Sequence, residues 1–164
     1  MKEAGYVKAA LAALLVVAAD QLTKLAIVSR FPRGAEIDVL GPFLRLGHAR
    51  NSGAVFGILR GAGEYFAVMS VLAAAIIVLV IYLARESSTI VKIGLGLVLG
   101  GAVGNLIDRV RYGAVVDFID IGVNDTIRWP SFNVADLAIT AGVIILIVFC
   151  LRPARQACGP ADPK

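Results

Sequence analysis

The chain has 164 residues, of which 59% are hydrophobic, and its mean hydropathy is +0.83. Because soluble domains are usually about half apolar, this excess argues against an ordinary globular protein and indicates a membrane protein. The formal net charge is +4, but the basic residues stand singly between apolar runs, so we expect anionic lipid headgroups and not nucleic acid as their partners.

Four apolar runs have the length that a membrane span requires, which is about 20 residues for a helix. We therefore predict an all-α membrane protein that forms one domain over residues 1–164. The four transmembrane helices are expected near residues 6–28, 65–83, 90–107 and 134–151.

The first run contains a local pattern, residues 17–19 before Asp20, that is typical of a signal-peptide cleavage site. Apolar sequence continues to Val28, so we favour a membrane span. Asp20 and Lys24 are four residues apart and share one helix face. They predict either an internal ion pair or a polar face turned toward a site, and both interpretations stay open.

The long connection after the first run is too polar to cross a membrane. Residues 36–40 and 43–46 partly alternate around Gly41 and Pro42, which predicts a small surface hairpin within residues 36–48. We interpret His48 as a loop or interface residue and not as a ligand. The glycines after Asn51 allow close backbone approach to a ligand, but they also suit a simple turn.

The second run contains no ionisable residue, which is typical of a scaffold helix. In the third run Gly96, Gly100 and Gly104 recur every four residues, and this spacing predicts a surface where another helix packs closely. The run ends where polar residues begin again, at residues 105–109.

Two carboxylates in apolar surroundings, Asp117 and Asp136, are the candidate catalytic groups. Ionisable residues at the margin of a membrane span are functional by default, and two adjoining carboxyl groups can share one proton and activate a water molecule. Asp136 also lies three residues after Asn133, as in a helix capping box. Capping and catalysis do not exclude each other.

Four spans place both chain ends on one side of the membrane. The cationic residues on that side lie in short segments near span ends, which favours the cytoplasm for both termini. The polar residues of the spans, Asp136 among them, should then meet at the outer face in one pocket. We expect the opposite half of the bundle to be almost purely apolar.

Five short motifs occur in order along the chain. They are Asp20-Gln21-x-x-Lys24, Asn51-x-Gly53-Ala54-x-Phe56, Gly100-Gly101-Ala102-x-Gly104-Asn105-Leu106-x-Asp108-Arg109, Val116-Asp117-Phe118 and Phe132-Asn133-x-Ala135-Asp136. Each motif alone is weak, but together they resemble the bacterial lipoprotein signal peptidase (signal peptidase II) family.

The resemblance implies an aspartic endopeptidase of the bacterial cytoplasmic membrane, with a small extramembrane sheet and a short surface helix over its site. It implies that lipidated prolipoproteins are the substrates, cut before a diacylglyceryl-modified cysteine. Asp117 and Asp136 would be the catalytic pair, and Asp20 and Lys24 would support the pocket. The implied substrate-binding residues are Asn51, Gly53, Asn105, Asp108, Arg109 and Asn133.

Two other classes of function stay open from the residues alone. A transporter or proton pathway would need polar residues along the full depth of the bundle. A non-catalytic assembly protein would depend on the glycine surface. We expect no cofactor and no metal, because Cys150, Cys158 and His48 have no ligand spacing, and we expect a monomer.

Overall fold

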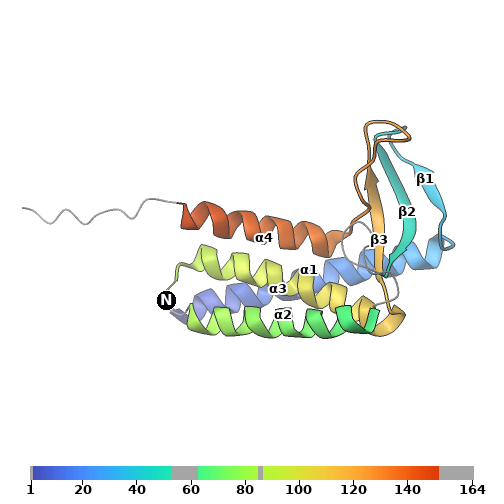
Figure 1. Cartoon of the computed structure of the whole chain (residues 1–164). Helices are drawn as coiled ribbons and strands as arrows, with labels where there is room; N and C mark the ends of the chain where they lie inside the picture. Colours follow the sequence, from blue (N-terminus) through green and yellow to red (C-terminus); the bar gives the residue numbers. More distant parts are fainter. Residues whose placement is uncertain (1, 53–62, 85–86, 152–164) are drawn as a thin grey trace, which may run out of the picture.

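A helical bundle with a small sheet at one end makes up the protein (Figure 1). The computed structural model describes residues 2–52, 63–84 and 87–151. The elements in chain order are α1 (Lys2–Arg30), β1 (Glu36–Asp38), β2 (Leu44–Asn51), α2 (Gly63–Leu83), α3 (Thr89–Tyr112), β3 (Val115–Ile121) and α4 (Val134–Cys150).

Three of these helices are long and apolar enough to cross a membrane, namely α1, α2 and α3, while α4 is apolar but shorter. The helix α3 extends beyond the predicted span of residues 90–107 and continues to Tyr112. The helix stops at Gly113, whose φ of 65° is the left-handed conformation that glycine adopts readily and whose N–H donates to the Arg109 carbonyl. Asp108 and Arg109 are therefore helical.

α3 lies at the centre of the bundle and packs against α1, α2 and α4. Its glycines allow this, as the spacing predicted. A Cβ atom on Gly100 would lie 2.7 Å from the carbonyl oxygen of Ala13 in α1, and one on Gly101 would overlap the carbonyl oxygen of Ala135 in α4. Only residues without a side chain fit so close to a neighbouring backbone.

α2 lies at the edge of the bundle and turns apolar side chains outward, including Val68, Met69 and Ile76. An exposed apolar surface of this kind is typical of a protein that contacts lipid.

The sheet has the strand order β1-β2-β3, and both pairings are antiparallel. The predicted hairpin is confirmed by β1 and β2. The third strand was not predicted, because residues 115–118 are an apolar run interrupted by Asp117, and all four are buried, so that buried and exposed positions do not alternate. A register shift between Leu46 and Ala49 marks a bulge in β2. The sheet stands at the end of the bundle opposite the N-terminus (Figure 1).

Two polar residues lie where the sequence did not predict them. His48 is not in a loop but in β2, with 5% of its surface exposed. Lys92 is buried in α3 near its N-terminal end, with its Nζ 4.2 Å from the centre of the Tyr6 ring. The expectation of an almost purely apolar opposite half was therefore wrong at this position. The short surface helix does not occur in the described residues, and residues 53–62 lie outside them.

Candidate active site

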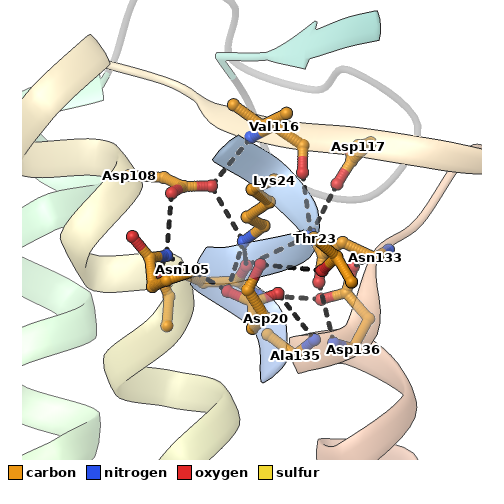
Figure 2. A network of polar contacts seen from close by, with 12 residues as sticks. Asp20, Thr23, Lys24, Asn105, Asp108, Val116, Asp117, Asn133, Ala135 and Asp136 are labelled. Atoms are coloured by element: carbon orange, nitrogen blue, oxygen red, sulfur yellow. Dashed lines mark hydrogen bonds and ion pairs between the residues drawn. The ribbon is translucent and has the colours of Figure 1, made fainter. Parts of the chain in front are cut away.

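Polar side chains of four chain segments point toward one another at the sheet end of the bundle, and all of them are buried except Asp136, which is half-buried (Figure 2). The contributing residues are Asp20 and Lys24 of α1, Asn105 and Asp108 of α3, Asp117 of β3, and Asn133 and Asp136 at the start of α4. The sequence predicted this meeting. The buried residues of α3 between Lys92 and Asn105 are glycine and leucine, so along this helix the polar residues are interrupted, whereas a transport pathway requires them along the full depth.

Lys24 neutralises two buried carboxylates at once. Its Nζ lies 2.8 Å from Oδ2 of Asp20 and 2.8 Å from Oδ2 of Asp108, and only 3% of the lysine is exposed. Nζ also donates to Oδ1 of Asn105 at 3.1 Å. A buried charge without a partner is strongly destabilising, so these groups depend on each other. The predicted internal ion pair is confirmed, and it also faces the site.

The two carboxylates that pair with Lys24 also accept hydrogen bonds from backbone N–H groups. Asp20 Oδ1 accepts a hydrogen bond from the N–H of Ala135 at 3.0 Å. Asp108 Oδ2 accepts one from the N–H of Val116 at 3.0 Å. Each of these backbone groups belongs to the residue directly before Asp136 or Asp117. The ionic cluster thereby fixes the backbone on which both candidate catalytic groups stand.

Asn133 caps α4 and also contacts the end of β3. Its Oδ1 accepts from the N–H of Asp136 at 3.0 Å, and its own N–H donates to Asp136 Oδ2 at 3.2 Å, so the predicted capping box is confirmed. Its Nδ2 donates to Oδ1 of Asp117 at 2.7 Å. One side chain thus joins the segments that carry the two acids.

Asn105 is the second amide between the acids and the ionic cluster. Its Nδ2 donates to Asp136 Oδ1 at 2.8 Å. Its Oδ1 accepts from Lys24 and, at 3.2 Å, from Asn133 Nδ2. Asp136 therefore accepts hydrogen bonds on both carboxylate oxygens, one from Asn105 and one from the backbone N–H of Asn133, at the N-terminus of α4.

Asp117 lies in a different electrostatic environment, with only 2% of its surface exposed. Burial and then the nearby charge of Asp136 raise the pKa of Asp117 to about 7 from an ordinary 3.8. Hydrogen bonds from Asn133 and Asn51 and the charge of Lys24 act in the opposite direction, but burial outweighs them. Asp117 is thus held in an environment that favours its protonated form.

Two more of the predicted residues, Asn51 and Arg109, lie near this pair. Asn51 ends β2 opposite Val115, and its side chain hydrogen-bonds Asp117. Arg109 is half-buried in the last turn of α3, and its charge acts on Asp136, Asp117 and Asp108. Gly53 lies outside the described residues.

Gln21 belongs to the site but was given no role from the sequence. Its Nε2 donates to the Gly104 carbonyl at 3.2 Å, to Asp108 Oδ1 at 3.1 Å and to Asp20 Oδ2 at 3.2 Å. The sequence could have indicated this role, because Gln21 follows Asp20 in a helix long enough to span a membrane, and a side-chain amide within a span needs hydrogen-bond partners. Within the described residues, no three side chains of His, Cys, Asp or Glu form a metal-binding group.

Comparison with known proteins adds an independent line of support. A sequence model of the family described as Signal peptidase (SPase) II matches residues 12–152. The lipoprotein signal peptidase of Moorella thermoacetica is 44% identical over 146 residues, which cover 89% of this chain and 94% of that protein. The corresponding protein of Syntrophus aciditrophicus is 38% identical over 147 residues, with 87% and 91% covered.

A solved structure described as a bacterial membrane enzyme, determined by the in meso method at 2.3 Å resolution, has a similar fold. It aligns with a TM-score of 0.76 at 32% identity and covers 95% of this chain and 94% of its own. Sequence and fold agree over nearly the whole length. The chain therefore belongs to the Signal peptidase (SPase) II family of bacterial membrane peptidases.

Proposed function

We propose that this protein is an aspartic endopeptidase that removes the signal peptide from diacylglyceryl-modified prolipoproteins, cutting before the lipidated cysteine. Family membership and the names of the relatives support the substrate class. The observation that carries the aspartic mechanism is the side chain of Asn133. Its amide nitrogen donates a hydrogen bond to the Asp117 carboxyl group, and its amide oxygen accepts one from the backbone N–H of Asp136. One side-chain amide therefore hydrogen-bonds both acidic residues.

In this mechanism the ionised Asp136 takes a proton from a water molecule, which attacks the peptide carbonyl carbon. The neutral Asp117 donates its proton to the carbonyl oxygen, and a proton then passes to the leaving amine. The raised pKa of Asp117 and the two N–H donors on Asp136 support these roles. The pair titrates as a unit, because each charge affects the other.

The other site residues would hold the substrate. We assign Asn51, Gly53 and Arg109 to the substrate backbone, with the Arg109 guanidinium binding a peptide carbonyl or a lipid phosphate. Asn105, Asp108 and Asn133 shape the pocket, and Asp20 with Lys24 supports it from α1. The fixed hydrogen bonds among the latter residues support a positioning role.

We infer a four-span topology for residues 1–164 as one domain in the bacterial cytoplasmic membrane. Three long apolar helices and the shorter apolar α4 support this topology. Both termini would lie in the cytoplasm and the sheet on the outer side. This arrangement puts the carboxylates at headgroup depth, where the peptide bond next to a diacylglyceryl cysteine lies.

The proposal is tested with Asp117→Asn and Asp136→Asn in the full-length protein. Purified variants are incubated with a diacylglyceryl-modified prolipoprotein, and cleavage is followed by gel shift. Each change should reduce turnover by several powers of ten, as for other residues that act as a catalytic unit. Asp125→Asn is the matched control, because Asp125 is exposed and pairs with Arg45 on the sheet surface.

Melting temperatures in detergent show whether the variants fold. Near-normal cleavage by a folded Asp117→Asn or Asp136→Asn protein would exclude the aspartic mechanism. A folded wild-type protein that does not cut the lipidated substrate would exclude the assigned substrate class.

A further inference from the structure

The three-stranded sheet has one charged face. Arg45 of β2 lies opposite Asp38 of β1 and Asp120 of β3, and its Nε forms an ion pair with Asp38 at 2.6 Å. Further ion pairs extend this charged face, whose members are Glu36, Asp38, Arg45, Asp120, Asp125 and Arg128. The ion-paired side chains of the sheet are thus gathered on one side of it.

The opposite side of the same strands is apolar. The two residues that flank Arg45 in β2 point away from the charged face, because successive side chains of a strand point to opposite sides. Together with their direct partners in β1 and β3 they form the apolar face, which consists of Ile37, Leu44, Leu46, Ile119 and Ile121. None of these five residues is buried, and Ile37 and Ile121 are exposed.

Two turns at the far end of the sheet add more exposed apolar side chains. The Gly122 N–H donates to the Phe43 carbonyl at 3.0 Å, and Arg128 Nη1 donates to the Pro42 carbonyl at 2.6 Å, so the two turns are joined. Their large apolar side chains have 59–68% of their surface exposed, and we call them the tip: Leu40, Phe43, Val123, Ile127 and Trp129. The tip extends past α4, beyond the side of the bundle (Figure 1).

The apolar face is the side of the sheet that is turned toward the helices. Asp117 and Ile119 are two residues apart in β3, so their side chains lie on the same side of the strand. Asp117 accepts a hydrogen bond from Asn133 at the start of α4, which fixes the direction of this side. Where the sheet extends past the bundle, its apolar face therefore points along the membrane-spanning helices and not away from them.

The apolar face is also continuous with the surface of α1. This helix is long and apolar enough to cross a membrane, and it exposes Leu22 and Leu25. An apolar groove of about 430 Å³ lies between its last turns and the sheet, and the groove is lined by Ile27 of α1 and Leu46 of the apolar face, among others. One apolar surface thus passes from a membrane-spanning helix to the sheet.

We propose that the apolar face and the tip bind membrane lipid, with the tip at the boundary between headgroups and acyl chains and the charged face in water. Large exposed apolar patches mark contacts with a protein or a membrane, and the continuity with α1 identifies the membrane. Tryptophan is enriched at this boundary because its ring is apolar and carries one polar N–H. The inference concerns the position of the sheet and does not depend on the proposed peptidase activity.

Fluorescence of the full-length protein in phosphatidylcholine nanodiscs tests this contact. Trp129 is the chain's one tryptophan, so its emission reports on the tip alone. Lipids brominated near the headgroup or near the chain ends quench the ring at shallow or deep positions, and acrylamide quenches it from water. Amphipathic surface elements enter the boundary by about 5–10 Å, so shallow bromination should reduce the emission about twofold and deep bromination should reduce it less.

Three results would overturn the inference. Strong quenching by acrylamide without quenching by either lipid would place the tip in water. Protection from all three quenchers would show that protein, such as a second copy or another segment of this chain, covers the tip. Stronger quenching by the deep lipid would place Trp129 inside the hydrocarbon and not at its boundary.

Two neighbouring substitutions test whether apolar side chains make the contact. Val123→Asp and Asn124→Asp each add one negative charge at an exposed position of the same loop, but only the first removes an apolar side chain from the tip. Aspartate at position 124 keeps the oxygen that accepts from the N–H groups of Thr126 and Ile127. Melting temperatures in detergent show that both variants are folded.

A charge at this boundary opposes insertion of the apolar residues beside it. We expect Val123→Asp to reduce the quenching by the shallow lipid about twofold or more, because the tip then moves toward water. Asn124→Asp should be quenched like the wild type. Equal quenching in all three proteins, or an equal loss in both variants, would show that Val123 makes no lipid contact and would overturn the inference.

Discussion

The side-chain amide of Asn133 donates to the Asp117 carboxyl group across 2.7 Å. The same amide caps α4 through its oxygen, so the start of this helix and the strand β3 are joined by one side chain (Figure 2). Helix capping alone would not need the contact with Asp117. The double use of Asn133 couples the local structure of α4 to the geometry of the proposed catalytic pair.

Replacing Asn133 with serine separates these two uses. Serine caps helices about as well as asparagine, but its hydroxyl is too short to reach Asp117. We expect α4 to remain intact while cleavage falls about 100-fold or more, the loss typical when one preorganised hydrogen-bond donor is removed from an active site. The free energy of unfolding should fall by about 1–3 kcal/mol, because a buried acceptor loses its donor. Circular dichroism and the gel-shift assay measure the two effects.

Asn124→Ser is the matched control for this substitution. Asn124 is exposed in the loop after β3, where its Oδ1 accepts from the backbone of Thr126 and Ile127, and serine can make a similar local bond. Activity should stay close to wild type. If Asn133→Ser is equally active, the amide serves only as a helix cap.

The pKa of Asp117, raised to about 7 by burial and by Asp136, predicts a pH limit for activity. Asp117 donates a proton in the proposed mechanism, so the active form exists below that value. We expect kcat/KM to fall about tenfold for each pH unit well above 7. The measurement is a pH profile with a lipidated prolipoprotein, and a rate that stays constant up to pH 9 would contradict the role of Asp117 as the acid.

The same group makes stability depend on pH. Its pKa is higher in the folded than in the unfolded state, so its contribution to stability is fully present below about 3.8 and is lost as pH rises through about 7. The free energy of unfolding of the wild type should therefore decline relative to Asp117→Asn between pH 4 and 7. A difference that does not change with pH would show that Asp117 ionises as readily in the folded protein as in the unfolded chain.

Removing the cation of the buried cluster should destabilise the protein strongly. Lys24→Met leaves Asp20 and Asp108 buried without the ammonium group that contacts both at 2.8 Å. Breaking a buried ion pair in this way costs about 3–5 kcal/mol. Thermal unfolding in detergent measures the loss, and Lys8→Met is the control because Lys8 is an exposed lysine of the same helix. Equal melting temperatures in the two variants would show that the cluster does not depend on Lys24.

Much of this site could be predicted from the sequence, because a carboxylate or amide in an apolar run is conspicuous. Asp117, Asp136 and Lys24 stood out for that reason, and span topology alone placed Asp136 and Lys24 near each other. The spacing of glycines every four residues likewise identified the packing surface of α3. These features could be predicted because each is visible within a single segment or follows from the direction in which the spans cross the membrane.

Other features depend on contacts between distant segments and left no local signal. The first four residues of β3 are all buried, so this half of the strand lacks the alternation by which a strand is recognised. Asp108 and Asp20 accept hydrogen bonds from the backbone N–H groups of Val116 and Ala135. Every residue except proline has such an N–H group, so the sequence could not indicate these partners. His48 was interpreted as a loop or interface residue because its place in the sheet depends on the chain just before β1 and on Phe31 after α1.

The close contact between α3 and α4 gives the last prediction. A Cβ on Gly101 would overlap the Ala135 carbonyl oxygen and lie 2.6 Å from Ile139 Cγ1, and a backbone group cannot move aside as a flexible side chain can. Gly101→Ala should therefore push away the first turn of α4, which contains Asp136, and lower both melting temperature and kcat. Gly94→Ala is the matched control, because its new methyl group would meet the Ile145 side chain at 3.1 Å and the Gly142 carbonyl oxygen only at 3.3 Å, whereas the Gly101 methyl would overlap the Ala135 carbonyl oxygen. We expect overpacking at Gly101 to cost about 1–3 kcal/mol and Gly94→Ala to cost less. Equal activity and stability in the two variants would show that α4 can shift without disturbing the carboxylates.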